Sequence, residues 1–347
     1  MRAVPRWIRW CALACWSALG TLAMAQSPVK LDHDGEVKAK VQALAQAHAS
    51  VVGVRSVAVE DARSNSSLGR ERAGSGVVIG DDGLVVTIGY LILEAAQVDL
   101  LIDGERVVPA RVVAYDLASG FGLVQALTPL RVPVARLGSS AAIGDDDPLM
   151  IASGGSKANL SVASLVSRRH FSGYWEYHIE NALFTSPPRM DHSGAALFNA
   201  NGELLGIGSL VVLDAMGAEK PRMAGNMFLP IDLLKEILPE LRRNGATRSS
   251  KRPWLGLNCV EVDGMVRVAR VMPDSPAEAA GLAPGDHIVR IDGKTVGDLT
   301  AFYKALWEGP EAEREVQLDV SRPGAGSATI TVRSQDRMRT LRTAKGI

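Results

Sequence analysis

The feature that most constrains the fold of this chain is a long succession of short, β-branched runs bounded by Gly, Asp and Asn. The runs cover residues 75–79, 84–88, 97–102, 106–114, 121–126, 148–152, 160–166, 194–198, 203–213 and 226–231. Many short strands with turn residues between them and few helices are typical of an all-β sandwich or a pair of barrels. We therefore expect a mainly β domain, with a further strand at 51–59.

Two segments at the ends of this domain have helical spacing instead. Residues 35–49 carry apolar side chains on one face, which predicts a short N-terminal helix. Residues 231–242 are amphipathic despite Pro239 and predict a helix that closes the domain. Between the first helix and the runs of the barrel, residues 60–73 form a polar loop.

The chain has 347 residues, which suggests two domains or more, and 47% of them are hydrophobic, which is enough for packed cores. Residues 242–252 hold five basic side chains and no acidic one. We predict that they form a solvated, flexible linker. Binding of lipid or of an acidic partner is the alternative for this segment.

The N-terminus has the three parts of a secretory signal peptide. Basic residues occur at Arg2, Arg6 and Arg9, and residues 11–25 carry no charge. The run ends on Ala-Met-Ala, which is a small-residue cleavage site. We therefore predict that residues 1–25 are removed during secretion.

Two alternatives to cleavage stay open. A retained membrane anchor is one, although the charge-free run has 15 residues and a bilayer span needs about 20. A lipoprotein anchored at Cys15 is the other, although Leu13 sits one place off the usual motif. After signal cleavage we expect no stable membrane span.

Charge and cysteine content narrow the classes of partner. Removal of the signal leaves 35 basic and 38 acidic residues, so no strong field for nucleic acid or anionic lipid is implied. Only Cys259 would remain, so the mature chain has no intramolecular disulfide and relies on its cores.

Two segments carry the residue types of a hydrolase. Residues 74–99 read GSGVVIGDDGLVVTIGYLILEAAQVD, and residues 185–208 read TSPPRMDHSGAALFNANGELLGIG. In this order they resemble the HtrA (Deg) family of trypsin-like serine proteases. The resemblance implies two six-stranded β-barrels within residues 26–241 and a periplasmic location.

The same resemblance implies a triad with two members replaced. The family run Thr-Asn-x-His-Val, whose His is the general base, matches residues 87–91 and puts Tyr90 at the base position. The family run Tyr-Asp-x-x-x-Asp-Leu-Ala matches residues 115–122 and puts Gly120 at the position of the orienting Asp. The nucleophile position keeps its serine, Ser193.

The chemistry of these replacements argues against proteolysis. A serine hydroxyl needs an adjacent base, and a phenol with a pKa of about 10 is protonated at neutral pH and places its oxygen differently from an imidazole nitrogen. Glycine has no side chain that could orient a base. The oxyanion hole is implied at the backbone of Ser193 and Asp191, where the family has Gly, and the Asp191 carboxylate would repel a developing negative charge. Ser193 is then a vestigial nucleophile.

Other titratable residues offer weaker candidates. His192 is next to Ser193, but adjacent residues on a tight turn usually point in different directions. Asp116 could be proposed as the acid, although the base position holds no His for it to orient. The spacing of His170 and His178 matches no common zinc pattern, and we expect no metal or cofactor.

A second signature begins at residue 253. Trp254, Leu255, Gly256 and Leu257 open it, and a Ser-Pro-Ala-x-x-Ala-Gly-Leu segment and a Pro-Gly-Asp turn follow. This pattern resembles the PDZ domain of HtrA proteins over residues 253–336. Such a domain adds an extended C-terminal peptide to an open sheet edge.

The resemblance implies where a peptide would bind. Backbone N–H groups of the 254–257 turn would hold its carboxylate, and a helix at 298–308 would line the groove. Residues 337–347 are then a C-terminal tail.

The favoured interpretation is an envelope pseudoprotease that binds protein C-termini or misfolded proteins through its PDZ domain, with a regulatory or chaperone-like role. Its partners would be peptides or unfolded proteins, an active HtrA-type relative, or further copies in a homo-oligomer. The alternatives are a serine endopeptidase with residual activity at Ser193 and a purely structural role. A PDZ domain that only docks on its own barrel is a further alternative.

Overall fold

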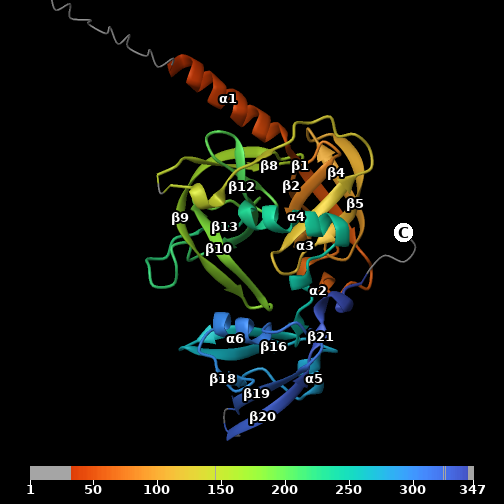
Figure 1. Ribbon diagram of the computed structural model, residues 1–347, viewed down its shortest axis with the longest axis vertical. Coiled ribbons are helices and arrows are strands. Elements are labelled where there is room, and N and C mark those ends of the chain that lie inside the picture. The colour runs from red at the N-terminus through yellow and green to blue at the C-terminus, as the bar shows by residue number, and fades with distance from the viewer. Residues whose placement is uncertain (1–32, 145, 323, 325, 343–347) are drawn as a thin grey trace, which may run out of the picture.

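The computed structural model describes residues 33–342 apart from 145, 323 and 325. The predicted signal peptide and its two alternatives, an anchor and a lipid-modified Cys15, lie outside the described residues. Figure 1 shows a larger β-domain, from which helix α1 (His33–Ala49) projects, and a smaller domain below it. Within the described residues, no helix is both long and apolar enough to cross a membrane.

The first half of the larger domain is a closed six-stranded barrel. Its strands are β1 (Val51–Ala58), β2 (Glu71–Val78), β3 (Leu84–Ile88), β4 (Ala95–Ile102), β5 (Arg106–Tyr115) and β6 (Phe121–Ala126). They pair antiparallel in the order β1-β2-β3-β6-β5-β4. Two short helices, α2 (Asn65–Leu68) and α3 (Gly89–Ile92), lie in its connections.

The second half is also a ring of six strands. Its elements are β7 (Arg136–Leu137), η1 (Ser140–Ala142), β8 (Leu149–Ser153), β9 (Asn159–Gly173), β10 (Tyr177–Ser186), β11 (Ala196–Phe198), β12 (Glu203–Val212), β13 (Gly225–Pro230) and α4 (Ile231–Asn244). The order is β11-β8-β9-β10-β13-β12, a β11–β12 pairing closes it, and β7 adds parallel to β12. The predicted mainly β fold is confirmed.

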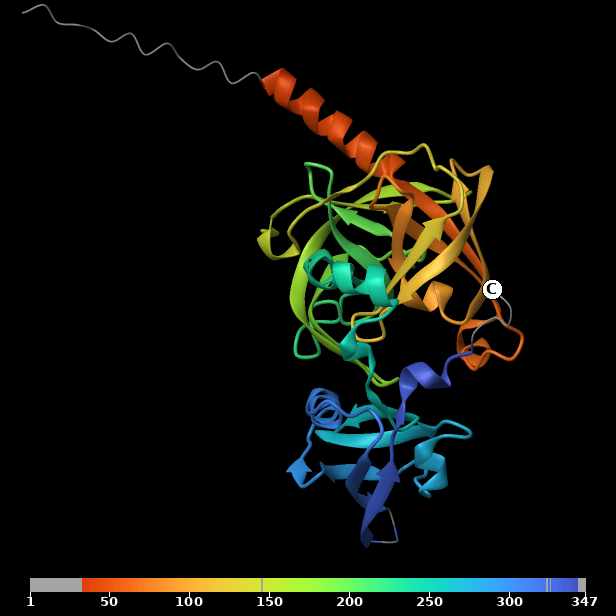
Figure 2. The same cartoon turned by 45° about the vertical axis from the view of Figure 1, so that its right-hand side comes forward.

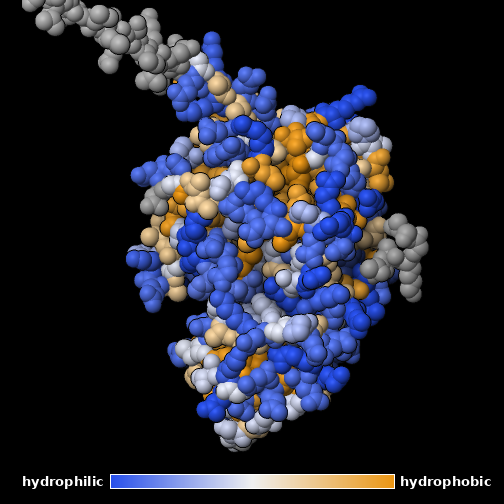
Figure 3. Space-filling view, viewed as in Figure 1, coloured by the Kyte–Doolittle hydropathy of each residue, from blue (hydrophilic) through white to orange (hydrophobic). Residues whose placement is uncertain are grey.

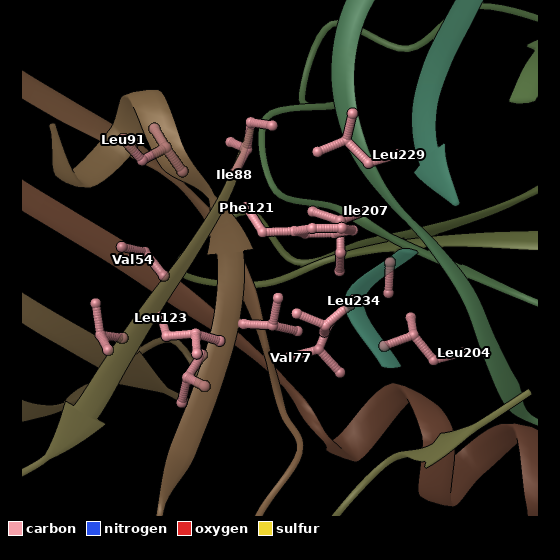
Figure 4. Packing of buried hydrophobic residues seen from close by; sticks show 14 of the residues in the cluster. Val54, Val77, Ile88, Leu91, Phe121, Leu123, Leu204, Ile207, Leu229 and Leu234 are labelled. Carbon is pink, nitrogen blue, oxygen red and sulfur yellow. The ribbon is translucent and has the colours of Figure 1, made fainter. Parts of the chain in front are cut away.

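A shared core joins the two barrels. Figure 4 shows side chains from both converging, among them Phe121 of β6 and Ile207 of β12, and both are fully buried. The barrels also approach each other closely at Gly194, where φ is +71° and an added Cβ would meet the Ser75 carbonyl. Because Ser193 precedes this glycine, the packing of the barrels fixes the position of Ser193.

The smaller domain has its own core and sheet. Its elements are β14 (Pro253–Trp254), β15 (Leu257–Val262), β16 (Met265–Val271), α5 (Pro276–Ala279), β17 (His287–Ile291), β18 (Lys294–Thr295), α6 (Leu299–Leu306), β19 (Glu315–Arg322), β20 (Gly326–Arg333), β21 (Gln335–Asp336) and η3 (Arg337–Thr340). The main sheet has the order β15-β16-β17-β19-β20. Both helices begin where side chains cap them, since Ser275 accepts from Glu278 N and Asp298 accepts from Ala301 N.

The segment between the domains differs from the predicted flexible linker. Helix α4 runs to Asn244, and a 3₁₀ turn, η2 (Arg248–Ser250), follows. Thr247 and Ser250 are buried, and both hydroxyls donate to the carboxylate of Asp116, at 2.5 and 2.6 Å. The expectation of a solvated joint is therefore wrong for these residues, because their hydroxyl groups satisfy a buried carboxylate on the first barrel.

Candidate active site and peptide groove

Tyr90 and Ser193 contact each other directly. Tyr90 lies in the helical turn α3, directly after strand β3, and its hydroxyl oxygen is 2.8 Å from Ser193 Oγ and 2.8 Å from the Ser209 carbonyl oxygen. A phenol has one proton, which it donates to the carbonyl, so the Ser193 hydroxyl donates to the phenol oxygen. The sequence does not predict this contact, because Tyr90 and Ser193 are 103 positions apart and meet only where the two barrels pack together.

The protonation state of Tyr90 decides what this contact does. Burial raises the pKa of Tyr90 to about 12, although the hydrogen bond with Ser193 opposes the rise. The phenol is therefore neutral at physiological pH and has no capacity to take the Ser193 proton. Tyr90 fixes the orientation of the hydroxyl without activating it.

Gly120 lies beside the Tyr90 turn, since its carbonyl accepts from Gly89 N at 2.7 Å. Its φ is +83°, in the left-handed region that side chains rarely adopt. A Cβ built here would be 2.8 Å from the hydroxyl of Tyr177, which itself donates to the Ser119 carbonyl at 2.9 Å. Tyr177 thus fills the space that a carboxylate at position 120 would need.

Asp116 is buried, and its hydrogen bonds give it a structural role and not a catalytic one. Its carboxylate accepts from Ser119 Oγ at 2.5 Å as well as from Thr247 and Ser250. Burial alone would raise the pKa of Asp116, but these three hydroxyl donors outweigh it and the pKa is lowered. The charge of Asp116 holds the interdomain segment against the first barrel.

Asp191 is tied to a buried arginine. Its carboxylate accepts from Arg189 Nε at 2.9 Å and from Ser153 Oγ at 2.5 Å. Arg189 also donates to the Ile151 carbonyl and to Ser161 Oγ. Burial opposes ionisation of Asp191, but Arg189 and Ser153 lower its pKa, so the carboxylate stays charged beside the Ser193 turn.

The hydrogen bonds of His192 among the described residues go to backbone carbonyls of its own loop and not to Ser193. Its Nδ1 lies 3.2 Å from the Arg189 carbonyl and 3.1 Å from the Met190 carbonyl, which makes Nδ1 a donor. Burial lowers the pKa of His192.

His170 and His178 contact neighbouring side chains. The ring nitrogens of His178 contact Ser172 and Glu180, and its ring lies 5.9 Å from that of His170.

No group of three or more His, Cys, Asp or Glu side chains with the geometry to hold a metal ion occurs in the part of the chain that the structure describes.

The 254–257 turn holds a carboxylate of the chain itself. Gly256 has φ +82°, and an added Cβ would collide with Ser275, so the turn needs glycine. The N–H groups of Gly256 and Leu257 donate to Glu176 at 2.8 and 2.9 Å, and that of Leu255 does so at 3.4 Å. Trp254 is buried in β14 at the start of the turn.

Glu176 lies at the tip of the β9–β10 hairpin, which extends from the larger domain toward the smaller one in Figures 1 and 2. Sequence reasoning identified the turn but missed Glu176. The signal available was the Tyr-Trp-Glu-Tyr sequence of residues 174–177, where an acidic residue stands among aromatic ones.

Comparison with known proteins agrees with both signatures. Residues 74–207 match the family described as the trypsin-like peptidase domain, and residues 253–333 match the PDZ domain family. The chain joins a trypsin-like peptidase domain to one PDZ domain. The PDZ domain is the smaller domain of Figure 1, and the turn at 254–257 lies in it.

The relatives of this peptidase–PDZ chain are DegP- and HtrA-type serine endoproteases. It is 28% identical over 260 residues to a putative protease Do-like 14 of Arabidopsis thaliana, covering 65% of this chain and 58% of that one. It is 27% identical over 240 residues to a probable periplasmic serine endoprotease DegP-like of Hahella chejuensis, covering 65% and 50%. The chain thus spans about half the length of these curated relatives.

Among solved structures, the HtrA-type protease AlgW with a decapeptide has the same fold. The TM-score is 0.52 at 19% sequence identity, over 86% of this chain and 98% of that one.

Proposed function

We propose that this chain is a periplasmic, HtrA-like pseudoprotease, whose barrels serve as a scaffold and whose PDZ domain binds protein C-termini or misfolded envelope proteins. The observation that carries the proposal is the hydrogen bond between Ser193 and a phenol of raised pKa where a histidine base would be needed. Gly120 supports it, because Tyr177 leaves no room there for an orienting carboxylate.

The periplasmic part of the proposal is supported by the relatives, several of which are described as periplasmic endoproteases. The peptide-binding part is supported by the PDZ match and by a structural neighbour that was solved with a decapeptide. The proposal includes two ways in which such a protein would act without proteolysis. It would regulate an active HtrA-type relative, or it would assemble with further copies of itself.

The test is covalent labelling of the chain from residue 26 onward with a fluorophosphonate probe. An active HtrA-type protease serves as the positive control and Ser193→Ala as the negative control. We expect labelling at least about 10³-fold slower than in the active control, since a serine without its base keeps only the residual effect of binding and the oxyanion hole. Labelling of Ser193 at a rate near that of the active control would overturn the pseudoprotease proposal.

A residual serine endopeptidase is the second candidate. It is favoured by one observation, which is that Ser193 keeps a hydroxyl in a fixed orientation between the barrels. Casein cleavage that is abolished by Ser193→Ala would establish this alternative, even if the rate is low.

A further inference from the structure

We propose that the tip of the β9–β10 hairpin, residues 173–176, is an internal ligand of the PDZ groove, with the Glu176 side-chain carboxylate in the place of a peptide's terminal carboxylate. An external peptide would bind only after this hairpin tip leaves the groove. The nature of the external ligand rests on the proposed peptide-binding function, whereas occupation of the groove by the hairpin tip is testable without any peptide.

The Glu176 carboxylate is bound as a peptide's terminal carboxylate would be. Both oxygens of Glu176 accept backbone N–H groups from the turn, Oε1 from Gly256 and Leu257 and Oε2 from Leu255. The Glu176 residue is 2% exposed, so the site is closed to solvent. Converging N–H groups are the means by which PDZ domains capture a terminal carboxylate, and hydrogen bonds to a charged acceptor are the strong ones.

The backbone of the hairpin tip also contacts the PDZ domain, at strand β15. Cys259 N donates to the Tyr174 carbonyl at 3.0 Å. Cys259 lies in β15 two residues after Leu257, and Tyr174 lies two residues before Glu176. The two contacts therefore follow one edge of β15, whose other edge pairs with β16. A peptide that adds a strand to this sheet would use the same edge.

Helix α6, the opposite wall of the groove, contacts the hairpin tip as well. The hydroxyl of Tyr303 donates to the Gly173 carbonyl at 2.8 Å and accepts from Glu176 N at 3.3 Å. Ser172 Oγ and Thr300 Oγ1 are 2.9 Å apart. The hairpin tip is thus bonded to β15 on one side and to α6 on the other, which is the position of a groove ligand rather than of a contact on the outer surface.

Charge complementarity supports the anionic form of Glu176. Burial raises the pKa of Glu176, while Arg337 and the N–H groups of the turn oppose this rise. Arg337 Nη1 also donates to the carbonyls of Trp175 and Glu176, at 3.1 and 3.2 Å. The turn presents only N–H donors to the Glu176 side chain. If the carboxyl group were protonated, its O–H would be a donor facing other donors.

These contacts define what an external competitor must present. It needs a carboxylate for the turn and, two residues earlier, a carbonyl for Cys259 N, which an extended peptide C-terminus supplies. Since the same N–H groups serve both ligands, the two exclude each other. The apparent affinity for a peptide is then reduced by the fraction of molecules whose groove is empty.

The first experiment measures backbone hydrogen exchange of residues 255–259 in the chain from residue 26 onward. Glu176→Gln removes the charge at constant shape, and Tyr303→Phe removes two contacts while keeping the ring that stacks on Trp307. We expect exchange about tenfold faster or more in both variants.

The matched control for these variants is Glu180→Gln. Glu180 lies on the same hairpin, is exposed, and pairs with Lys304 at 2.7 Å away from the turn. We expect this variant to exchange within about twofold of the wild type, as surface ion pairs contribute little. Unchanged exchange at 255–257 in both Glu176→Gln and Tyr303→Phe would overturn the proposal.

The second experiment tests displacement with a fluorescein-labelled peptide that ends in Tyr-Trp-Val with a free carboxylate, and with its C-terminal amide. We expect the free acid to bind Glu176→Gln about tenfold more tightly than wild type, and the amide to bind both weakly. At saturation, residues 173–178 should lose protection while residues 255–259 keep it.

The outcomes separate the two proposals. Peptide binding with full protection of residues 173–178 would show that the hairpin tip does not compete, and would overturn the internal-ligand proposal. Faster exchange in Glu176→Gln without binding of any free-acid peptide would support the internal ligand and count against the proposed peptide-binding function.

Discussion

At the scale of single residues, the identity of Tyr90 predicts the loss of a base, but the sequence does not predict where the phenol lies. The hydroxyl bridges Ser193 and the Ser209 carbonyl, and these residues come from distant parts of the chain. Their meeting depends on the packing of the two barrels, which a local pattern does not encode. Likewise, the positive φ of Gly120 and the nearby Tyr177 hydroxyl become visible only in three dimensions.

The raised pKa of Tyr90 predicts the pH dependence at Ser193. A histidine base would give a sigmoidal step in the labelling rate near its pKa of about 6.5. Because the pKa of Tyr90 is about 12, the phenol is neutral throughout the pH range of the measurement, and no such step should occur. The measurement is the rate of fluorophosphonate labelling from about pH 5 to pH 9, beside an active HtrA-type protease.

His192→Asn is the control for this pH profile, since the other base candidate would be removed. Since burial lowers the pKa of His192, a step in the wild type below the usual histidine pKa of about 6.5 that disappears in His192→Asn would assign the base to His192 and contradict our expectation.

Restoration of the triad should fail at Gly120. We expect Gly120→Asp to destabilise the fold by about 2 kcal/mol or more, because a non-glycine residue at this φ costs about 1–3 kcal/mol and the new Cβ meets the Tyr177 hydroxyl. Tyr90→His with Gly120→Asp should therefore not cleave casein. Urea unfolding and a casein assay are the measurements.

The matched variant adds Tyr177→Phe, which deletes the hydroxyl that lies 2.8 Å from the new Cβ. It should recover part of the lost stability but not the cost of the backbone conformation. Casein cleavage by the Tyr90→His and Gly120→Asp pair at the rate of an active relative would show that the backbone at position 120 adapts to the aspartate.

At the scale of elements, the sequence predicted most strands and both long helices to within a few residues, because alternation and turn residues are local signals. Strand β10 (Tyr177–Ser186) was missed. Its register shifts between Ile179 and Ala182, and Asn181 has a positive φ, so a bulge interrupts the alternation that would have identified the strand.

The burial of part of the linker, residues 242–252, is not predictable for a different reason. Composition records its five basic residues, but the two residues that fix it are Thr247 and Ser250, and their acceptor is more than 130 positions away in sequence. Four of the basic residues, Arg242, Arg243, Arg248 and Lys251, are exposed, so the composition predicts their solvation but not the burial of the hydroxyl groups between them.

The Asp116 carboxylate and its three hydroxyl donors, Ser119, Thr247 and Ser250, form a buried cluster that we call the clasp. The clasp gives a prediction for Asp116→Asn. The three hydroxyl donors would lose their charged acceptor, and we expect the free energy of unfolding to fall by about 2–3 kcal/mol. Urea unfolding at neutral pH is the measurement. The pKa of Asp116 is lowered in the folded protein, so its contribution to the free energy of unfolding depends on pH. This contribution is fully present above the unfolded pKa of about 3.9 and is lost as the pH falls through the lower folded pKa.

Asp82→Asn is the control for the clasp. Asp82 pairs with Arg242, close to the same segment, but both side chains are largely exposed. This variant should change stability by about 0–1 kcal/mol. An effect of Asp116→Asn no larger than that of Asp82→Asn would mean that the clasp does not stabilise the fold.

At the scale of the whole molecule, several contacts among the described residues join the two domains. The hairpin tip enters the PDZ groove, the clasp of Asp116 fixes the linker, and the segment after the PDZ domain returns to the larger one. In that last segment Arg337 bonds the hairpin, and Arg342 N donates to Glu94 of the first barrel at 2.8 Å. Figure 3 shows the resulting surface as mostly hydrophilic, with the smaller domain seated against the larger one.

Arg337→Ala tests whether these contacts hold the domains together. Arg337 supplies positive charge beside the buried Glu176 carboxylate and donates to two carbonyls of the hairpin. Its removal leaves a buried carboxylate with less compensation, so the closed arrangement should lose about 1.5–3 kcal/mol relative to an open one. We expect faster proteolytic cleavage within residues 173–176 and a larger radius of gyration by small-angle scattering.

Arg339→Ala provides the comparison, because Arg339 lies in the same 3₁₀ turn but is mostly exposed and pairs only with Glu313 in the contacts of the described residues. This variant should match the wild type in both measurements. A radius of gyration and a cleavage rate for Arg337→Ala equal to those of Arg339→Ala would mean that the other contacts between the domains hold them together without the charge of Arg337.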